Sequence, residues 1–135
     1  GDVVFVLGSE LSPLAETNRR RLLNLAGISF IGVQALPAQL AQQRYDVLIE
    51  GIFGTGFAGR LPAAVAACCR LLNASDGLKV ALDMPTGLNG DTGDVDADVF
   101  RAELTYTFGA YKPAHLMDAG RAVCGEIVCL AIGIQ

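Results

Sequence analysis

The sequence predicts an α/β protein with a Rossmann-like, doubly wound, three-layer sandwich and a mostly parallel sheet of about six or more strands. Short apolar runs alternate with longer helical segments along the whole chain, which is typical of βαβ units. Several of these runs are continuously apolar, as in strands that are buried on both faces. No internal repeat or Pro/Ser-rich linker divides the 135 residues, so we expect a single domain over residues 1–135.

The first strand and helix follow from local patterns. Residues 3–7 form an apolar run rich in valine, which suits a central parallel strand. A turn containing Ser12 and Pro13 follows, and apolar residues then recur over 14–26 in a pattern typical of a helix. Gly27 is a residue type that often ends helices. We therefore predict a helix over 14–26.

The remaining elements follow from the same rules. Pro37 and Pro62 each stand at the start of a segment with helical character, where proline is favoured. The predicted strands are 28–33, 47–49, 80–82, 104–108 and 126–132, and the predicted helices are 37–43 and 62–74.

Composition limits the classes of function. The formal net charge of −4 argues against a nucleic-acid surface, and the basic run 19–21 is interpreted as a solvated helix face. No apolar stretch approaches the roughly 20 residues that span a bilayer, and the run 3–7 is too short for a signal peptide. The four cysteines form no C-x-x-C pair and are expected to be reduced core residues. We therefore expect a cytoplasmic protein that binds neither membrane nor nucleic acid.

Two carboxylates mark the ends of neighbouring predicted strands. Glu50 follows the apolar run 47–49, and Asp83 follows the run 78–82. In an open α/β sheet, ligands bind outside the carboxyl ends of the strands, so we expect these carboxylates to lie side by side in one site. Their repulsion requires that one carboxylate has a raised pKa, is hydrogen-bonded, or shares a cation. The alternative is that Asp83 only caps its own loop through N–H groups around Thr86.

A glycine-rich loop follows Glu50 and precedes the predicted helix 62–74. Backbone N–H groups, a helix N-terminus and an arginine could together bind a phosphate. The alternative is that the glycines serve only the steric needs of a strand–helix turn. The candidate substrate-binding residues of this loop are Gly54, Thr55, Gly56, Phe57, Ala58, Gly59 and Arg60.

Lys112 follows the predicted strand 104–108, so it belongs to the same edge of the sheet as Glu50 and Asp83, and His115 lies in the loop beyond Pro113. Near two carboxylates, Lys112 would be an ion-pair partner or a proton donor; the alternative is a surface lysine. His115 is the only histidine and has no spaced partner, so we interpret it as an ordinary loop residue.

These motifs, taken together, resemble the YjeF N-terminal domain family, the NAD(P)H-hydrate epimerases. That family carries, in order, Asp-x-x-Phe-Gly-Thr-Gly, Asp-x-Pro-Ser-Gly leading into Asp-Thr-Gly, Thr-x-Thr-Phe-Gly, Lys-Pro-Gly and a final Gly-Glu-x-x-x-x-x-Ile-Gly-Ile strand. The matching segments of this chain are 50–56, 83–93, 105–109, 112–113 and 125–134.

The resemblance implies an isomerase that repairs nicotinamide cofactors by interconverting the R and S epimers of hydrated NAD(P)H. It implies a potassium ion bound by Glu50 and Thr86, a substrate loop over 54–60, and Asp83 as a further substrate contact. For the reaction we assign Asp83 as the acid and base and Lys112 as its electrostatic partner. It also implies a homodimer, and a fused or separate NAD(P)H-hydrate dehydratase; the linker to a fused dehydratase would begin at about Gln135.

Several positions differ from the family pattern. The glycine-rich loop that follows the family's first strand, and supplies an Asn ligand to potassium, is replaced here by 8–13, which contains Glu10, Leu11 and Pro13. Glu50 replaces the Asp that begins the family's Asp-x-x-Phe-Gly-Thr-Gly motif, and Thr86 replaces the Ser of Asp-x-Pro-Ser-Gly. Ala114 replaces the Gly of the Lys-Pro-Gly turn. These changes weaken the expectation of a bound potassium ion and leave the retention of activity open.

A rival hypothesis comes from another functional class. The fold also resembles a domain of an mRNA-decapping enhancer, in which degenerate glycine loops accompany dimerisation and partner binding. The altered loop 8–13 favours such a catalytically degenerate nucleotide-binding or scaffolding module. The glycine loops 54–56 and 83–93 oppose it.

Overall fold

The computed structural model describes residues 1–8 and 10–133, which form two compact units, Gly1–Gln43 and Arg44–Gln135. Within the described residues, six strands alternate with helical segments except between β4 and β5, and every pair of neighbouring strands is parallel. The predicted α/β class and parallel pairing are therefore confirmed. The six strands form two sheets, with the order β1-β2 in the first unit and β3-β4-β5-β6 in the second.

The first unit is built on two parallel strands, β1 (Val3–Leu7) and β2 (Ile28–Gly32). Phe5 and Phe30 are paired in register, and their rings stack with centroids 5.2 Å apart. A 3₁₀ turn, η1 (Val33–Ala35), follows β2 and leads into the helix α2 (Leu36–Gln42).

The helix α1 (Pro13–Leu22) connects these strands and is shorter than the predicted helix 14–26. Ser12 caps its N-terminus by accepting a hydrogen bond from the Ala15 N–H at 3.1 Å. At the other end, the Leu25 N–H bonds to the Leu22 carbonyl three residues back. Such a tight turn ends the helix. Gly27, with a φ of +78°, then precedes the first residue of β2.

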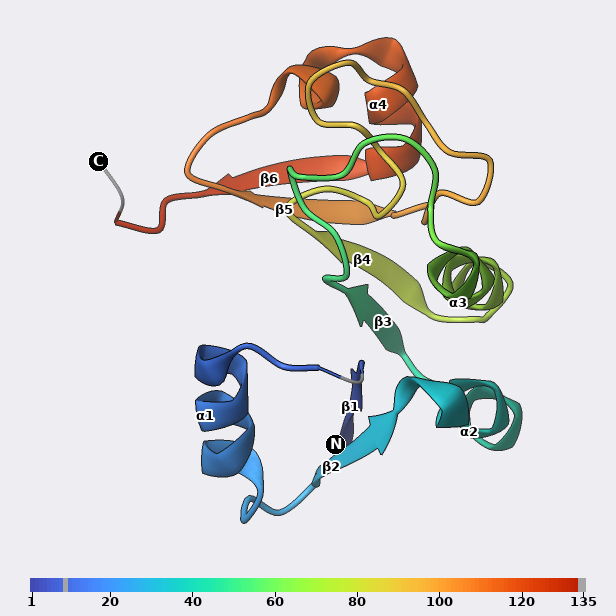
Figure 1. Cartoon of the computed structure of the whole chain (residues 1–135), viewed down its shortest axis with the longest axis vertical. Coiled ribbons are helices and arrows are strands. Elements are labelled where there is room, and N and C mark those ends of the chain that lie inside the picture. The colour runs from blue at the N-terminus through green and yellow to red at the C-terminus, as the bar shows by residue number, and fades with distance from the viewer. Residues whose placement is uncertain (9, 134–135) are drawn as a thin grey trace. The chain divides into compact units, whose positions relative to one another are not determined.

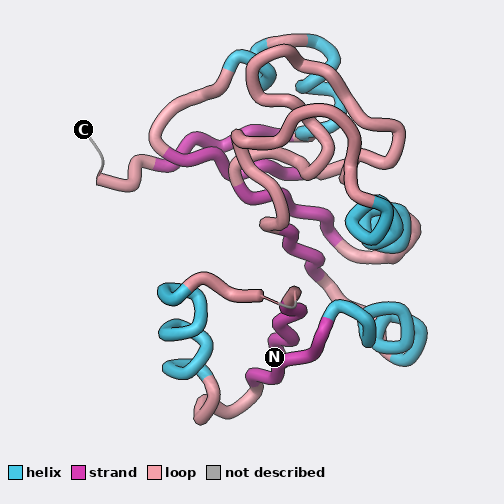
Figure 2. Tube along the Cα trace, in the orientation of Figure 1, coloured by secondary structure: helices cyan, strands magenta, loops and turns pink. Residues whose placement is uncertain are grey.

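The second unit contains the longer sheet, formed by β3 (Val47–Glu50), β4 (Leu78–Leu82), β5 (Leu104–Phe108) and β6 (Glu126–Leu130). Figure 1 shows these strands in that order across the unit. The strand β6 ends earlier than the predicted 126–132 because its partner β5 ends at Phe108, which pairs with Leu130. The chain between β4 and β5 contains no helix (Figure 2).

Two apolar cores stabilise the second unit. The first lies where the helix α3 (Ala63–Asn73) packs near β4 and the loop before β5. The second includes the helix α4 (Asp118–Cys124) and the loop after β4. The buried members of the first are Phe57, Leu61, Ala66, Cys69, Ala81, Phe100 and Ala102, and those of the second are Met84, Leu88, Val99, Ala114, Val123 and Cys124.

The helix α4 and the 3₁₀ turn η2 (Pro113–Leu116) were absent from the predicted elements. The sequence of α4 is short and contains Gly120, a residue type that weakens a helix. The structure explains this glycine, since a Cβ at Gly120 would overlap the carbonyl of Ala114. Close packing of α4 against η2 therefore requires the residue that obscures the helix in the sequence.

Candidate functional site

The backbone at Asp83 is strained at the end of β4. Asp83 has a φ of +70°, and it is the one residue other than glycine with a positive φ in the described chain. The Met84 N–H donates to the Leu82 carbonyl at 2.9 Å, which closes a γ-turn centred on Asp83. A positive φ at this turn is rare and costs energy, so neighbouring contacts must hold it, as happens often in active sites.

The Asp83 side chain is held by two residues that lie on or after β5. Lys112 Nζ donates to Asp83 Oδ1 at 2.8 Å, and the Thr107 hydroxyl lies 3.2 Å from the same oxygen. Lys112 Nζ also donates to the Phe108 carbonyl at 3.0 Å. The Asp83 and Lys112 side chains are about one-fifth exposed, so the ion pair is screened less than a surface pair.

The other carboxylate oxygen of Asp83 faces the glycine loop. A Cβ placed on Gly54 would lie 3.0 Å from Asp83 Oδ2. In the part of the chain that the structure describes, Oδ2 has no hydrogen-bond donor. The structure thus brings Asp83, Lys112 and the start of the predicted substrate loop together, and it leaves one carboxylate oxygen for a ligand.

Glu50 and Thr86 form a separate, buried group. Glu50 Oε1 accepts the Thr86 N–H at 2.8 Å, and Oε2 accepts the Thr86 hydroxyl at 2.7 Å and the Ile52 N–H at 3.0 Å. Thr86 Oγ1 in turn accepts the Phe53 N–H at 3.0 Å. Burial raises the pKa of Glu50, although these three hydrogen bonds act in the opposite direction.

The two carboxylates therefore have different partners. The strands β3 and β4 are paired as expected, but Glu50 binds Thr86 while Asp83 binds Lys112. The suggestion that Asp83 caps its loop through N–H groups around Thr86 is wrong, since Glu50 accepts the Thr86 N–H.

Glu50 and Thr86 are the residues that the family resemblance assigns to potassium. A carboxylate has about four lone pairs and a hydroxyl two; three hydrogen bonds reach Glu50, and one reaches Thr86 Oγ1. Among the described residues no lysine or arginine is paired with Glu50. The pair can therefore supply two oxygens to a hard cation. Over the same residues, no cluster of three or more His, Cys, Asp or Glu could hold a metal.

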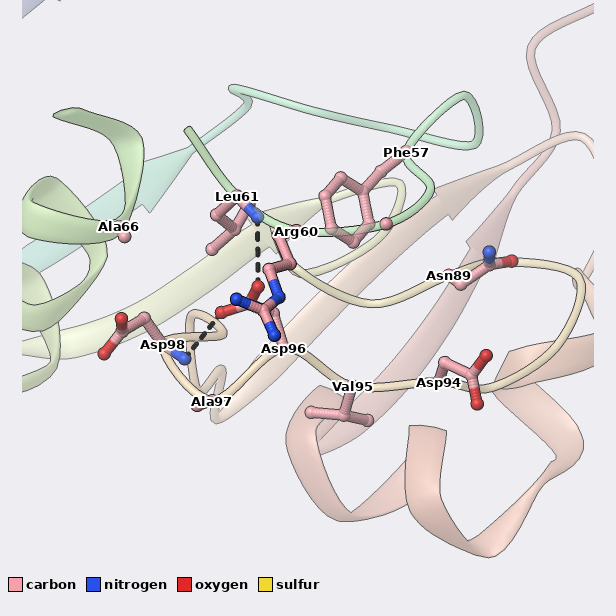
Figure 3. Close-up of a pocket in the computed structure, with 11 residues that line it drawn as sticks. Phe57, Arg60, Leu61, Ala66, Asn89, Asp94, Val95, Asp96, Ala97 and Asp98 are labelled. Atoms are coloured by element: carbon pink, nitrogen blue, oxygen red, sulfur yellow. Dashed lines mark hydrogen bonds between the residues drawn. The ribbon is translucent and has the colours of Figure 1, made fainter. Parts of the chain in front are cut away.

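The far end of the glycine loop lines a cavity of about 610 Å³. Asp96 lies at this end, where its Oδ2 accepts the Leu61 N–H at 3.0 Å, just before α3 begins. Figure 3 shows the Arg60 guanidinium beside Asp96. Hydrogen bonds from the Asp98 and Leu61 N–H groups, and then the Arg60 charge, lower the pKa of Asp96.

The charges around this cavity disfavour a phosphate. The residues that line it include Arg60 but also three carboxylates, Asp94, Asp96 and Asp98. Asp98 is itself paired with Arg70 at 2.7 Å. The protein's own Asp96 carboxylate thus accepts the N–H before α3 that a phosphate would need.

The segment that replaces the family's first glycine-rich loop lies in the first unit. Leu7, Gly8 and Leu11 line a cavity of about 460 Å³ there, together with Glu16 and Arg19 of α1. Hydrogen bonds from Arg19 and Arg20 lower the pKa of Glu16 to about 2. The cavity therefore carries an ion pair near the positions where the family has glycines; Ser9 lies outside the described residues.

The interpretation of His115 as an ordinary loop residue is wrong. His115 is 1% exposed and lies in η2. Its Nδ1 accepts the Lys112 N–H at 2.8 Å, and its Nε2 lies 3.0 Å from the Asp83 carbonyl oxygen. Only its place two residues after Pro113, beyond a strand end, could have connected it to the site.

The helices of the described residues bear on membrane insertion, and the cysteines on disulfide bonding. No helix in the described residues is long and apolar enough to cross a bilayer. The four cysteines are free; burial raises the pKa of Cys69 to about 12 and that of Cys124 to about 11.

Comparison with known proteins identifies relatives of this chain. The bifunctional NAD(P)H-hydrate repair enzyme Nnr of Pyrobaculum aerophilum is 35% identical over 135 aligned residues, which cover 97% of this chain and 27% of that protein. The enzyme of the same name from Archaeoglobus fulgidus is 42% identical over 89 residues, covering 66% of this chain and 18% of that protein. The NAD(P)H-hydrate epimerase of Rhodopirellula baltica is 37% identical over 89 residues, covering 66% and 36%.

The chain thus spans about a third or less of the length of most of these curated relatives. A family model described as "YjeF-related protein N-terminus" matches residues 2–114. This match covers most of the chain and includes Glu50, Asp83, Thr86 and Lys112. The chain therefore belongs to the family of YjeF-related protein N-termini.

Proposed function

We propose that this chain is an NAD(P)H-hydrate epimerase domain, an isomerase that interconverts the R and S epimers of hydrated NAD(P)H. The observation that carries the proposal is the geometry of Asp83. A strained γ-turn presents its carboxylate with Oδ1 held by Lys112 and Oδ2 facing Gly54. The names of the relatives support the same reaction. The scaffolding hypothesis is less favoured, because strained backbone of this kind clusters at active sites and the relatives carry the names of enzymes.

Epimerisation requires one proton transfer to the leaving oxygen and one proton transfer from the oxygen of the incoming water. The hydroxyl on the hydrated ring carbon takes a proton, the carbon–oxygen bond breaks, and water leaves with that bond's electron pair. Water then adds to the other face of the ring cation and loses a proton, so that the overall composition is unchanged. A carboxyl group that gives the first proton and accepts the second performs both steps. We assign this role to Asp83, through Oδ2.

Lys112 is the electrostatic partner in this proposal. Its ammonium group holds Asp83 Oδ1 and two further oxygens, those of Thr107 and Phe108. Because these contacts immobilise Lys112 before substrate arrives, the carboxylate needs little rearrangement during proton transfer.

The glycine loop, with Gly54, Thr55, Gly56, Phe57, Ala58, Gly59 and Arg60, is proposed to contact the substrate. The carboxylates around the cavity at its far end support contact with sugar hydroxyls there rather than with the pyrophosphate. Hydroxyl groups donate well to carboxylates, whereas phosphates are repelled by them.

We further propose that potassium binds at Glu50 and Thr86. The buried Glu50 carboxylate with no cationic partner among the described side chains supports this assignment. A bound ion would supply a positive charge close to the substrate. A cytoplasmic location is supported by the four free cysteines. A dehydratase partner is suggested by the bifunctional relatives, and the homodimer stays a prediction of the family resemblance.

The test is epimer exchange on the purified chain. The isolated R epimer of NADH hydrate is mixed with the protein in potassium or in sodium buffer, and the S epimer is followed by chromatography. The proposal predicts formation of the S epimer faster than the spontaneous rate, with further acceleration by potassium. A folded sample that leaves the spontaneous rate unchanged would exclude the activity for this chain and restore the scaffolding hypothesis.

A further inference from the structure

The hydrogen bonds of His115 determine the protonation state of its ring. The partner of Nδ1 is the backbone N–H of Lys112, which can only donate, so Nδ1 must carry a lone pair. The partner of Nε2 is the carbonyl of Asp83, which can only accept, so Nε2 must carry the proton. His115 is therefore neutral, with its proton on Nε2, and both ring nitrogens are satisfied.

The groups that face the ring favour this neutral state. Burial lowers the pKa of His115, and the Lys112 charge acts in the same direction. The hydrogen bond to the Asp83 carbonyl and the Asp83 carboxylate act in the opposite direction. The Tyr111 ring lies edge-on to the imidazole, with the ring centroids 6.2 Å apart.

These contacts tie together the two residues to which we assign the chemistry. The imidazole bridges the carbonyl of Asp83, in the γ-turn, to the backbone of Lys112, while Lys112 Nζ reaches Asp83 Oδ1. Asp83 and Lys112 are thus joined once through their side chains and once through His115. Among the described residues, His115 is the one side chain that donates to the Asp83 carbonyl. Without the imidazole, this carbonyl in the γ-turn would lose its side-chain donor.

We propose that His115 is a positioning residue that holds the γ-turn at Asp83 and the backbone of Lys112 so that Asp83 Oδ2 faces the substrate beside Gly54. His115 itself transfers no proton, because both of its nitrogens are engaged away from the substrate. The catalytic part of this inference rests on the proposed function of Asp83 and Lys112; the positional part does not.

The positional part is tested by NMR on the wild-type chain and on His115→Leu, and neither measurement depends on activity. The ¹⁵N shifts of the His115 ring at neutral pH should show a protonated Nε2 and an unprotonated Nδ1. In His115→Leu, exchange of the Met84 amide hydrogen should become faster, because the γ-turn is released. A charged ring, a proton on Nδ1, or unchanged Met84 exchange would overturn the inference.

The catalytic part is tested by three variants. His115→Leu removes both hydrogen bonds, His115→Gln can keep a donor near Nε2, and His115→Asn can keep an acceptor near Nδ1. Displacement of a reacting group by about 1 Å costs on the order of 100-fold, so we expect about that loss of kcat in His115→Leu, with KM nearly unchanged. Each amide variant should recover part of the loss. Leu116→Ala, at a 71% exposed neighbour, is the control and should keep full activity.

The outcomes separate the two proposals. If the wild type has no epimerase activity but shows the expected ring tautomer and Met84 exchange, the proposed function fails and the positioning of Asp83 stands. If the wild type is active and the variants keep its kcat, His115 has no positioning role in catalysis. If His115→Leu does not fold, the amide variants and the wild-type spectrum still decide the question.

Discussion

The Thr86 hydroxyl donates to Glu50 Oε2 at 2.7 Å, in a place where Glu50 is 3% exposed and Thr86 is fully buried. The same carboxylate accepts the Thr86 N–H through its other oxygen, so a single side chain at the end of β3 fixes the loop after β4. This arrangement ties the ends of two neighbouring strands together beside the Asp83–Lys112 pair.

Removal of the Thr86 hydroxyl should destabilise the protein. In Thr86→Val, which has nearly the same shape, the half-buried Phe53 N–H loses its acceptor and the buried Glu50 Oε2 loses a donor. We expect a loss of about 1–3 kcal/mol in the free energy of unfolding, measured by urea denaturation. Thr86→Ser keeps the hydroxyl and should lose only about 1 kcal/mol, for the missing methyl group. Equal losses in both variants would contradict this account.

Potassium should stabilise the wild type through the same pair. At equal ionic strength, a potassium concentration of a hundred times Kd adds about 2.7 kcal/mol to the free energy of unfolding. Thermal unfolding in potassium and in tetramethylammonium chloride measures the difference, and Thr86→Val should reduce it strongly. The same stabilisation in Thr86→Val would remove Thr86 from the ion's ligands.

A side chain at Gly54 should disturb Asp83. The Cβ of Gly54→Ala would lie 3.0 Å from Asp83 Oδ2, which is closer than an ordinary contact. We expect at least about a tenfold loss of kcat, because the carboxylate must move away. Gly51→Ala is the matched control, since its Cβ would meet the Leu82 side chain only at ordinary distances of 3.4 Å and beyond. Equal effects of both substitutions on kcat would argue against a role for the Gly54–Asp83 contact.

Acidification should destabilise the protein through His115. Burial lowers the pKa of this residue below its ordinary value of 6.5. Between the native pKa and 6.5, the unfolded chain binds a proton that the native chain does not. The free energy of unfolding therefore falls as the pH falls below about 6.5, by at most about 1.4 kcal/mol per unit. Urea denaturation from pH 7.5 downward measures this slope.

Glu50 contributes to the same curve with the opposite sign. Its pKa is raised above the ordinary 4.5, so the native chain holds its proton more tightly, and stability falls as the pH rises from 4.5 toward the native pKa. The His115 slope is therefore obtained as the difference between the wild type and His115→Gln, which both retain Glu50. If the two slopes were the same between pH 6.5 and 5, His115 would not have the lowered pKa.

The sequence was sufficient to place Glu50, Asp83 and Lys112 at one edge of the sheet, because each lies at or beyond the carboxyl end of a strand in a parallel sheet. It could not show which carboxylate would bind Thr86. That choice depends on the γ-turn at Asp83, which directs the Asp83 side chain toward Lys112. The Thr86 N–H in the loop after β4 therefore donates to Glu50.

Other features depend on contacts between distant residues. Nothing near His115 in the sequence indicates its bond to Asp83, which lies 32 residues earlier in the chain. The helix α4 was missed because Gly120 lowers its helix propensity, and the reason for that glycine is the close approach of Ala114.

The most direct test of the central claim compares epimer exchange in the wild type, in Asp83→Asn and in Asp91→Asn. Asp83→Asn keeps the shape of the side chain but removes its ability to exchange a proton. Asp91 lies exposed in the loop after β4, so Asp91→Asn is a matched control for the same chemical change. We expect Asp91→Asn to convert the R epimer at the wild-type rate, whereas the rate of Asp83→Asn should be at least about 100-fold lower. Full activity in a folded Asp83→Asn protein would contradict the assignment of Asp83 as the acid and base.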